Sequence, residues 1–242
     1  MKGYIFKGIT LKKRIILFFP LVLQSMFIDQ SEIHEIREYK DVAYLFAHPD
    51  PRTLFVFDVD DTLIINPTYS TPPKKGLTFD AFIKEFSRGV QDTAYRLIDP
   101  LILEYITSIQ RQGVKVVGLT HCINGSFGMG PGMIMVPSLP RLRYEKLKDI
   151  GFDFSSSFEN QEITFCCTIE TRDFHPLYYK GILFTDLMDK GSFLGGFLEN
   201  IGWTPRNVVF FDDKRENVYS VLQAMHRRNI PCEGFLYQGA IR

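Results

Sequence analysis

The stretch FVFDVDDTLI places three carboxylates, those of Asp58, Asp60 and Asp61, directly after an apolar run. A second acidic pair, Asp212 and Asp213, ends the apolar run of NVVFFDD. Carboxylates that gather at the ends of neighbouring buried strands repel one another, and a divalent cation removes that repulsion. Magnesium suits such a set, because it binds a few carboxylates and keeps water or phosphate oxygens in its other positions. These residues therefore suggest a site for a divalent cation at the ends of the strands.

Two further residues, Thr120 and Lys190, occupy positions from which they can join the acids. Thr120 ends the apolar run VKVVGLT, and Lys190 opens the segment KGSFLGGFL shortly before NVVFFDD. A lysine at the same place would balance part of the acidic charge. Alone, Thr120 would be a polar strand end and Lys190 a surface lysine, so their value comes from their place in the set.

Strand-like and helix-like segments alternate beyond residue 30, and this pattern sets where these residues meet. TLFVFDV, VKVVGLT, GILFTD, NVVFFDD and CEGFLYQ read as strands, and GSFLGGFLENIG and ENVYSVLQAMHRRN read as helices. The alternation predicts an α/β, Rossmann-like protein with a central parallel sheet and helices on both faces. Ligands bind beyond the carboxyl ends of such strands, where the acids would converge.

The segment IDPLILEYITSIQRQG predicts a further helix. Asp99 is its expected N-cap and Pro100 lies in its first turn. Ile102, Ile106 and Ile109 fall on one face, which we expect to be buried.

The same residues resemble the four signatures of the haloacid dehalogenase-like (HAD) phosphatase superfamily. FDVDDTL is similar to the first signature, D-x-D-x-T, and Thr120, Lys190 and the acidic VVFFDDKREN resemble the second, third and fourth. One match would be moderately specific, whereas four in the family's order are strong. GFDFSSSF, YYKGILFT and FFDDKRENV also resemble an uncharacterised, mostly exported bacterial branch, a domain of unknown function without an assigned substrate.

The resemblance implies a three-layer α/β/α HAD fold and a role for each signature residue. Asp58 would attack phosphorus and form an aspartyl-phosphate, and Asp60 would act as acid and base at the leaving oxygen and the water. Thr120 would donate a hydrogen bond to the phosphoryl group, and Lys190 would stabilise its charge. Mg²⁺ would be held by Asp58, by the backbone carbonyl of Asp60, and by Asp212 or Asp213.

Neighbouring residues receive lesser roles. Asp61 and Thr62 are expected to brace the turn after the strand, and Asn217 to orient an acid of the fourth signature. His121 reads as a polar strand terminus in preference to a substrate contact. The remaining histidines show no metal-ligand spacing.

Three competing sites fail on their residues. A calcium loop beginning at Asp58 would need glycine at Leu63 and a bidentate acid at Tyr69. The stretch CCTIETR has the Cys-x5-Arg spacing of cysteine-dependent phosphatases, but Glu170 would repel phosphate, so we interpret it as a strand. GSFGMGPGM is glycine-rich without the G-K-[ST] ending of a nucleotide-binding loop, and we interpret it as a flexible loop over the site.

Segments between the signatures are short. Residues 66–97 include LTFDAFIKEFSRGVQDTAYRL, expected as a helix beside the site. Residues 122–180 form a small insertion, with a helix at 142–150 and a hairpin that pairs EITFCCTIE with YYKGILFT. We therefore expect a single domain over 29–242 with a small or absent cap and an open site.

Composition restricts the partners. Among 242 residues, 28 basic side chains balance 28 acidic ones, so no overall field favours nucleic acid or an anionic membrane. Residues 1–28 have a basic start and a short apolar run, which resembles a signal peptide and is too short to cross a bilayer; an apolar core or interfacial segment is the alternative. We expect export to the periplasm or medium, with a cytoplasmic protein as the alternative. The four cysteines contain no C-x-x-C pair and merely permit disulfides.

The resulting hypothesis is a Mg²⁺-dependent phosphomonoester hydrolase with a phosphorylated substrate of unknown class. Two alternatives stay open: a phosphotransferase or mutase of the same fold, and a catalytically idle binding protein. The substrate and the oligomeric state do not follow from the sequence.

Overall fold

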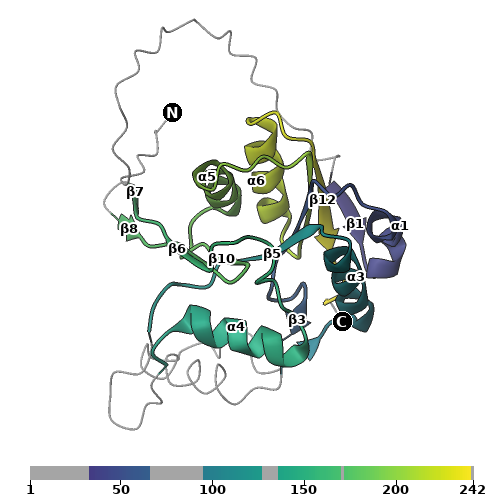
Figure 1. Ribbon diagram of the computed structural model, residues 1–242, viewed down its shortest axis with the longest axis horizontal. Helices are drawn as coiled ribbons and strands as arrows, with labels where there is room; N and C mark the ends of the chain where they lie inside the picture. The colour runs from purple at the N-terminus through teal and green to yellow at the C-terminus, as the bar shows by residue number, and fades with distance from the viewer. Residues whose placement is uncertain (1–32, 66–94, 127–135, 170–171, 241–242) are drawn as a thin grey trace, which may run out of the picture.

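The computed structural model describes residues 33–65, 95–126, 136–169 and 172–240 (Figure 1). The expected leader at 1–28, most of the expected helix at 77–97 and most of the glycine-rich loop at 125–133 lie outside these ranges. Within them, no helix combines the length and the apolar character needed to cross a membrane.

A sheet of eight strands forms the centre, in the order β1-β12-β11-β2-β5-β10-β9-β6. Neighbouring strands from β1 through β12, β11, β2 and β5 to β10 pair in parallel. At the edge beyond β10, strands β9 and β6 add antiparallel pairings. The strands of this sheet are β1 (Ile33–Ile36), β2 (Thr53–Phe57), β5 (Lys115–Thr120), β6 (Glu162–Thr164), β9 (Leu177–Tyr179), β10 (Ile182–Phe184), β11 (Asn207–Asp212) and β12 (Cys232–Tyr237).

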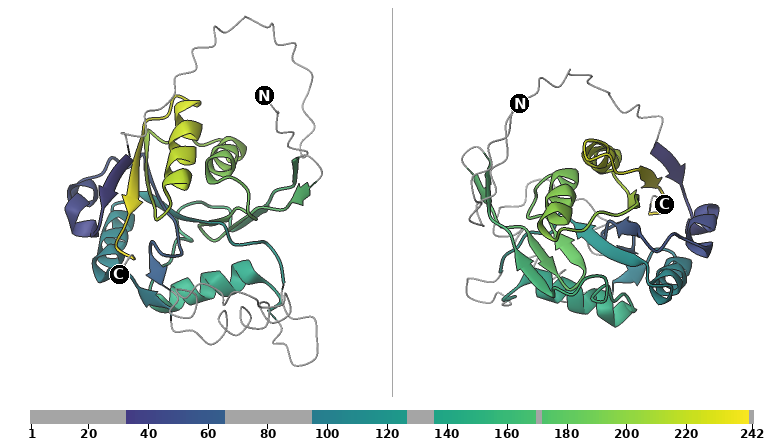
Figure 2. Two further views of the ribbon diagram at one scale, coloured as in Figure 1. Left: turned by 180° about the vertical axis from the view of Figure 1, so that it is seen from behind. Right: turned by 45° about the horizontal axis from the view of Figure 1, so that its top comes forward.

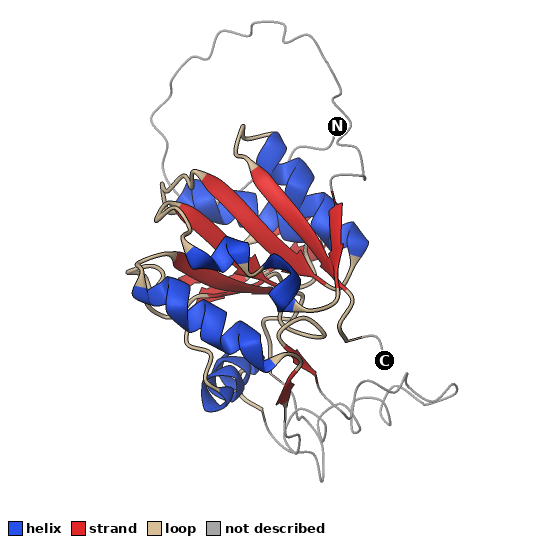
Figure 3. Ribbon diagram, turned by 90° about the vertical axis from the view of Figure 1, so that its right-hand side faces the viewer, coloured by secondary structure: helices blue, strands red, loops and turns tan. Residues whose placement is uncertain are grey.

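Helices cover both faces of the sheet and make three layers (Figures 1 and 3). Helices α5 and α6 lie on one face, and α3 and α4 lie on the other (Figure 1). The helices are η2 (Tyr39–Val42), α1 (Tyr44–Ala47), α3 (Pro100–Arg111), α4 (Leu139–Ile150), α5 (Lys190–Asn200) and α6 (Arg215–His226). The predicted α/β class with a mostly parallel central sheet is confirmed.

Alternation along β2 divides the core into two apolar clusters. Phe55 and Phe57 pack with α3 and α4, whereas Leu54 and Val56 pack with α5 and α6. All four side chains are buried, which marks a strand covered on both faces. Burying a large apolar side chain contributes about 1.5–3 kcal/mol, so β2 is firmly held and gives a rigid base for the residues that follow it.

Helix α3 forms as its sequence predicts. The Asp99 side chain accepts a hydrogen bond from the Leu101 N–H at 2.9 Å, and Pro100 is the first helical residue. Ile102, Ile106 and Ile109 are its buried residues. The N-cap satisfies a backbone donor that the first turn leaves without a partner.

The expected hairpin in the insertion forms in part, because the start of EITFCCTIE pairs antiparallel with the start of YYKGILFT. Strand β6 pairs with β9, and β9 pairs with β10 through a tight turn. Lys180 and Gly181, with φ of 45° and 83°, make this turn, so that residues 177–179 pair locally with 182–184. The stretch CCTIETR, expected as one strand, is divided between two strands, β7 (Cys167–Ile169) and the start of β8 (Arg172–Phe174). These two strands pair with each other and project from the edge of the sheet (Figures 1 and 2).

A further two-stranded sheet, formed by β3 (Ile64–Ile65) and β4 (Arg96–Leu97), follows the acidic segment. Backbone N–H groups of Leu63 and Ile64 both donate to the Val59 carbonyl at 3.1 Å. Asp61 has a φ of 60° within this tight turn. The chain therefore reverses immediately after the buried strand β2, which holds the acids at the edge of the sheet.

Candidate active site

The carboxyl ends of three parallel strands bring the predicted residues together. Asp58 follows the last residue of β2, Thr120 ends β5, and Asp212 ends β11. Strand β2 lies between β5 and β11 in the sheet, and its Asp58 N–H donates to the Phe211 carbonyl at 2.8 Å. Lys190 is the first residue of α5, and its side chain reaches the same edge.

Lys190 is the centre of a buried ion cluster. Its Nζ donates to Asp58 Oδ1, and to Asp212 Oδ2 at 2.6 Å. Burial lowers the pKa of the ammonium group, but the two carboxylates outweigh this effect and raise the pKa above its usual value. Lys190 is therefore charged although only 2% of its side chain is exposed.

Close packing of two helices places Lys190. A Cβ on Gly191 would lie 2.2 Å from the Ser220 carbonyl oxygen on α6, so no larger residue fits there. The Asp189 side chain caps α5 by accepting from the Ser192 N–H at 2.8 Å, and it also accepts from the Ser220 hydroxyl. The start of α5 is thus anchored to α6 on both sides of Lys190.

Asp212 is held by donors on α6. Its Oδ1 accepts from the Lys214 N–H and from Asn217 Nδ2, both at 2.9 Å. The predicted role of Asn217 in orienting an acid of this segment matches these contacts. Since the N-terminus of a helix favours negative charge, the start of α6 also stabilises the Asp212 carboxylate.

Asp58 lies in the least favourable environment for a charge. Burial, opposed by Lys190, raises the pKa of Asp58 well above its usual value, and the Asp212 carboxylate raises it further. Thr62 Oγ1 donates to Asp58 Oδ2 at 3.2 Å. Thr62, expected to brace the turn, therefore touches the predicted nucleophile itself.

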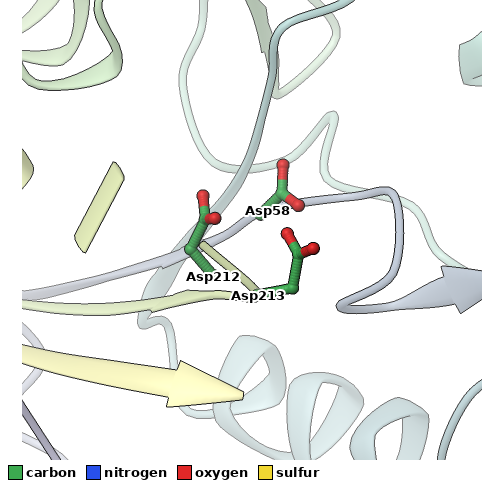
Figure 4. A group of neighbouring side chains, drawn as sticks. All are labelled: Asp58, Asp212 and Asp213. Carbon is green, nitrogen blue, oxygen red and sulfur yellow. The ribbon is translucent and has the colours of Figure 1, made fainter. Parts of the chain in front are cut away.

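Asp213 completes an acidic group that fits a hard cation. One carboxylate oxygen each of Asp58, Asp212 and Asp213 lies within 4.8 Å of the others, and Figure 4 shows the three side chains next to one another. Burial and the Asp212 carboxylate raise the pKa of Asp213 to about 6. The three acids share one buried ammonium group, Lys190, so the cluster is short of positive charge, and its oxygen donors are those that Mg²⁺ prefers.

The side chain of Asp60 contacts Arg143 and Thr120 in place of Lys190. Its Oδ1 accepts from Arg143 Nη1 at 2.8 Å, and Thr120 Oγ1 lies 3.5 Å from its Oδ2. Thr120 also accepts from the Cys122 N–H at 3.2 Å. Thus the structure gathers Asp58, Asp212, Asp213 and Lys190 in one cluster and places Asp60 and Thr120 beside each other.

Sequence reasoning missed two residues of this region. Arg143 comes from α4, and no local pattern marks a partner 83 positions from Asp60. Thr185 follows β10, is fully buried, and donates its N–H to the Thr120 carbonyl at 2.9 Å. The polar end of GILFTD was a usable signal for Thr185, because this strand lies beside β5 in the same parallel sheet.

Two buried polar atoms near this edge have no hydrogen-bond partner within the described ranges. They are Thr185 Oγ1 and His121 Nε2. His121 follows Thr120, and burial and the nearby Lys190 ammonium lower its imidazole pKa. A neutral imidazole next to the cluster is compatible with the predicted strand terminus.

All four cysteines are free thiols in the described part of the chain. Cys122 lies nearest to the site, and burial raises the pKa of its thiol to about 11. A thiol in this state is a poor nucleophile. Cys166 is exposed and Cys167 is buried, and Cys167 lies in a strand.

A comparison with protein families matches residues 78–242 to a family described as a protein of unknown function, DUF2608. The matched part includes Thr120, Lys190, Asp212 and Asp213, and it begins after Asp58 and Asp60. No curated protein matches the chain. Because the match covers more than half of the sequence, the chain belongs to the DUF2608 family.

Proposed function

We propose that this protein is a HAD-like phosphatase, a Mg²⁺-dependent phosphomonoester hydrolase that works through an aspartyl-phosphate on Asp58. The observation that carries the proposal is the buried cluster in which Lys190 joins Asp58 to Asp212, with Asp213 beside them. A structural ion pair would need only one acid. Keeping three carboxylates around one ammonium is costly unless a cation and an anionic substrate use them.

The first half-reaction transfers the phosphoryl group to Asp58. An electron pair of a carboxylate oxygen forms the bond to phosphorus, and the bond from phosphorus to the leaving oxygen breaks with its pair going to that oxygen. Asp60 supplies the proton that the leaving oxygen takes up. Lys190 offsets charge on Asp58 and on the transferred group, and the Thr120 hydroxyl donates to a phosphoryl oxygen.

The second half-reaction returns Asp58 to its carboxylate form. Water gives a proton to Asp60 and its oxygen bonds to phosphorus, while the bond between phosphorus and Asp58 breaks and phosphate leaves. Asp58, Asp212 and Asp213 are the residues that would hold Mg²⁺. The ion would offset the negative charge of these carboxylates and of the phosphate. Asp60 therefore alternates between acid and base.

The decisive experiment measures phosphate release from para-nitrophenyl phosphate by the full chain, with Mg²⁺ and with EDTA. Asp58→Asn should abolish the release, while Arg111→Gln, a change of an exposed residue of α3 outside the cluster, should leave it unchanged. Acid quenching should also trap a hydroxylamine-labile phosphoryl group on the protein that Asp58→Asn lacks. Hydrolysis that survives Asp58→Asn would refute the proposal.

The same assay separates hydrolysis from transfer. With a mixture of alcohols and sugars added as acceptors, a phosphatase releases inorganic phosphate in an amount equal to the phenol. A phosphotransferase or mutase releases less phosphate than phenol, because the acceptor retains the difference.

A further inference from the structure

Arg143 brings a second element to the predicted acid-base residue. It lies in α4, within the insertion, and its Nη1 donates to Asp60 Oδ1 at 2.8 Å. The Asp60 side chain is 45% exposed, whereas that of Arg143 is 16% exposed. The contact therefore sits where the buried cluster opens toward solvent.

Three described groups surround the Arg143 guanidinium. Its centre lies 5.2 Å from the centre of the Tyr95 ring, and it also interacts with the Cys122 side chain. Burial lowers the pKa of Arg143, but the Asp60 carboxylate and Tyr95 outweigh this effect and raise it above its usual value. A cation held by both a ring and a carboxylate has little freedom to turn, so it also restricts the carboxylate.

The arginine distinguishes the two oxygens of Asp60. A guanidinium has only donors, so the oxygen that it holds, Oδ1, acts as an acceptor and does not carry a proton. Oδ2 lies on the side of Thr120, whose hydroxyl is 3.5 Å away. Any proton that Asp60 exchanges is thereby directed to Oδ2, next to the residue expected to bind the phosphoryl group.

We propose that Arg143 is a positioning residue for proton transfer, which holds Asp60 Oδ1 so that Oδ2 faces the leaving oxygen of the substrate. This inference rests on the proposed phosphatase function and adds to it a role for α4. In the step concerned, the Oδ2 proton moves to the leaving oxygen as its bond to phosphorus breaks. The insertion thereby contributes to the chemistry itself.

Leaving groups of different basicity test this role. Phenolate is a poor leaving group and needs the proton, whereas dinitrophenolate leaves without it. We compare kcat/KM, because it reports the steps up to release of the leaving group, whereas hydrolysis of the aspartyl-phosphate is common to both esters. Arg143→Gln should lower kcat/KM on phenyl phosphate by about tenfold or more, as part of the roughly 10²–10⁴-fold that acid-base catalysis contributes, and lower kcat/KM on dinitrophenyl phosphate far less. Asp60→Asn should show the same selectivity with a larger loss.

Arg141→Gln is the matched control. Arg141 lies two residues away on the same helix, is 63% exposed, and pairs with Glu162 at 3.5 Å. We expect its activity on both esters to equal that of the wild type. Arg143→Lys, which keeps the charge and one donor to Asp60, should recover part of the loss on phenyl phosphate.

Equal losses of kcat/KM on both esters in Arg143→Gln would overturn the inference, since that result would make Arg143 a binding group for the phosphoryl part that the two substrates share. No loss of kcat/KM on either ester would also overturn it. Thermal unfolding of each variant shows whether it is folded at the assay temperature, and Arg143→Lys serves if Arg143→Gln is not. Failure of the phosphatase proposal looks different: the wild type itself would then hydrolyse neither ester.

Discussion

Two of the cation-carboxylate contacts at the site have similar lengths but lie in different environments. Lys190 Nζ is 2.6 Å from Asp212 Oδ2, with 2% and 0% of the two side chains exposed. Arg143 Nη1 is 2.8 Å from Asp60 Oδ1, with 16% and 45% exposed. Distance alone would rank the contacts as equal.

Burial makes the difference between them. Near the surface, water screens an ion pair, and such pairs contribute about 0–1 kcal/mol. In the interior the attraction is stronger, and removing one partner leaves a charge that water cannot reach. The Lys190 cluster is thus expected to contribute more to folding than the Asp60-Arg143 pair, which under the proposed function orients the acid-base residue.

The largest expected effect comes from removing the buried cation, Lys190. Lys190→Met removes the cation that Asp58 and Asp212 share, and we expect the free energy of unfolding to fall by about 3–5 kcal/mol. Urea unfolding followed by circular dichroism measures this change. Arg111→Gln, which removes an exposed cation on α3 outside the cluster, should change stability by about 0.5 kcal/mol or less. Similar values for the two variants would contradict the assigned role of burial.

An intermediate effect concerns pH. The pKa of Asp213 is raised from 3.8 to about 6 in the folded protein, so between these values the folded state binds more protons than the unfolded state. Without divalent cation, stability should therefore decrease as pH rises from about 4 to about 6, and less so in Asp213→Asn. Thermal unfolding across this range gives the slopes. Added Mg²⁺ should raise the unfolding temperature of the wild type at pH 7 and that of Asp213→Asn much less.

The smallest expected effect is the coupling between Asp60 and Arg143, the more exposed pair. A double-mutant cycle with Asp60→Asn and Arg143→Met should give a coupling energy of about 1 kcal/mol or less, because Asp60 is nearly half exposed. The same cycle with Asp212→Asn and Lys190→Met should give a clearly larger value. A coupling for Asp60 and Arg143 that equals the buried one would remove the distinction on which this comparison depends.

Local patterns predicted the elements of the core well. Continuous apolar runs marked β2, β5, β10, β11 and β12, and the spacing of Ile102, Ile106 and Ile109 marked the buried face of α3. These elements have strong periodicity and clear end signals, so neighbouring residues contain the needed information. Strands β6 to β9 were harder, because three-residue strands have no usable period and the turn at Lys180 and Gly181 decides their pairing.

The sequence by itself determined which side chains stand at the ends of the parallel strands, because each apolar run ends in a polar residue. Asp58, Thr120 and Asp212 can be placed at one edge of the sheet from the sequence alone. Only the tertiary structure decided which cation pairs with which acid: Lys190 contacts both Asp58 and Asp212, and Arg143 pairs with Asp60. The reason is physical, since strand ends follow from local patterns, whereas an ion pair between residues 83 positions apart depends on how helix and sheet pack.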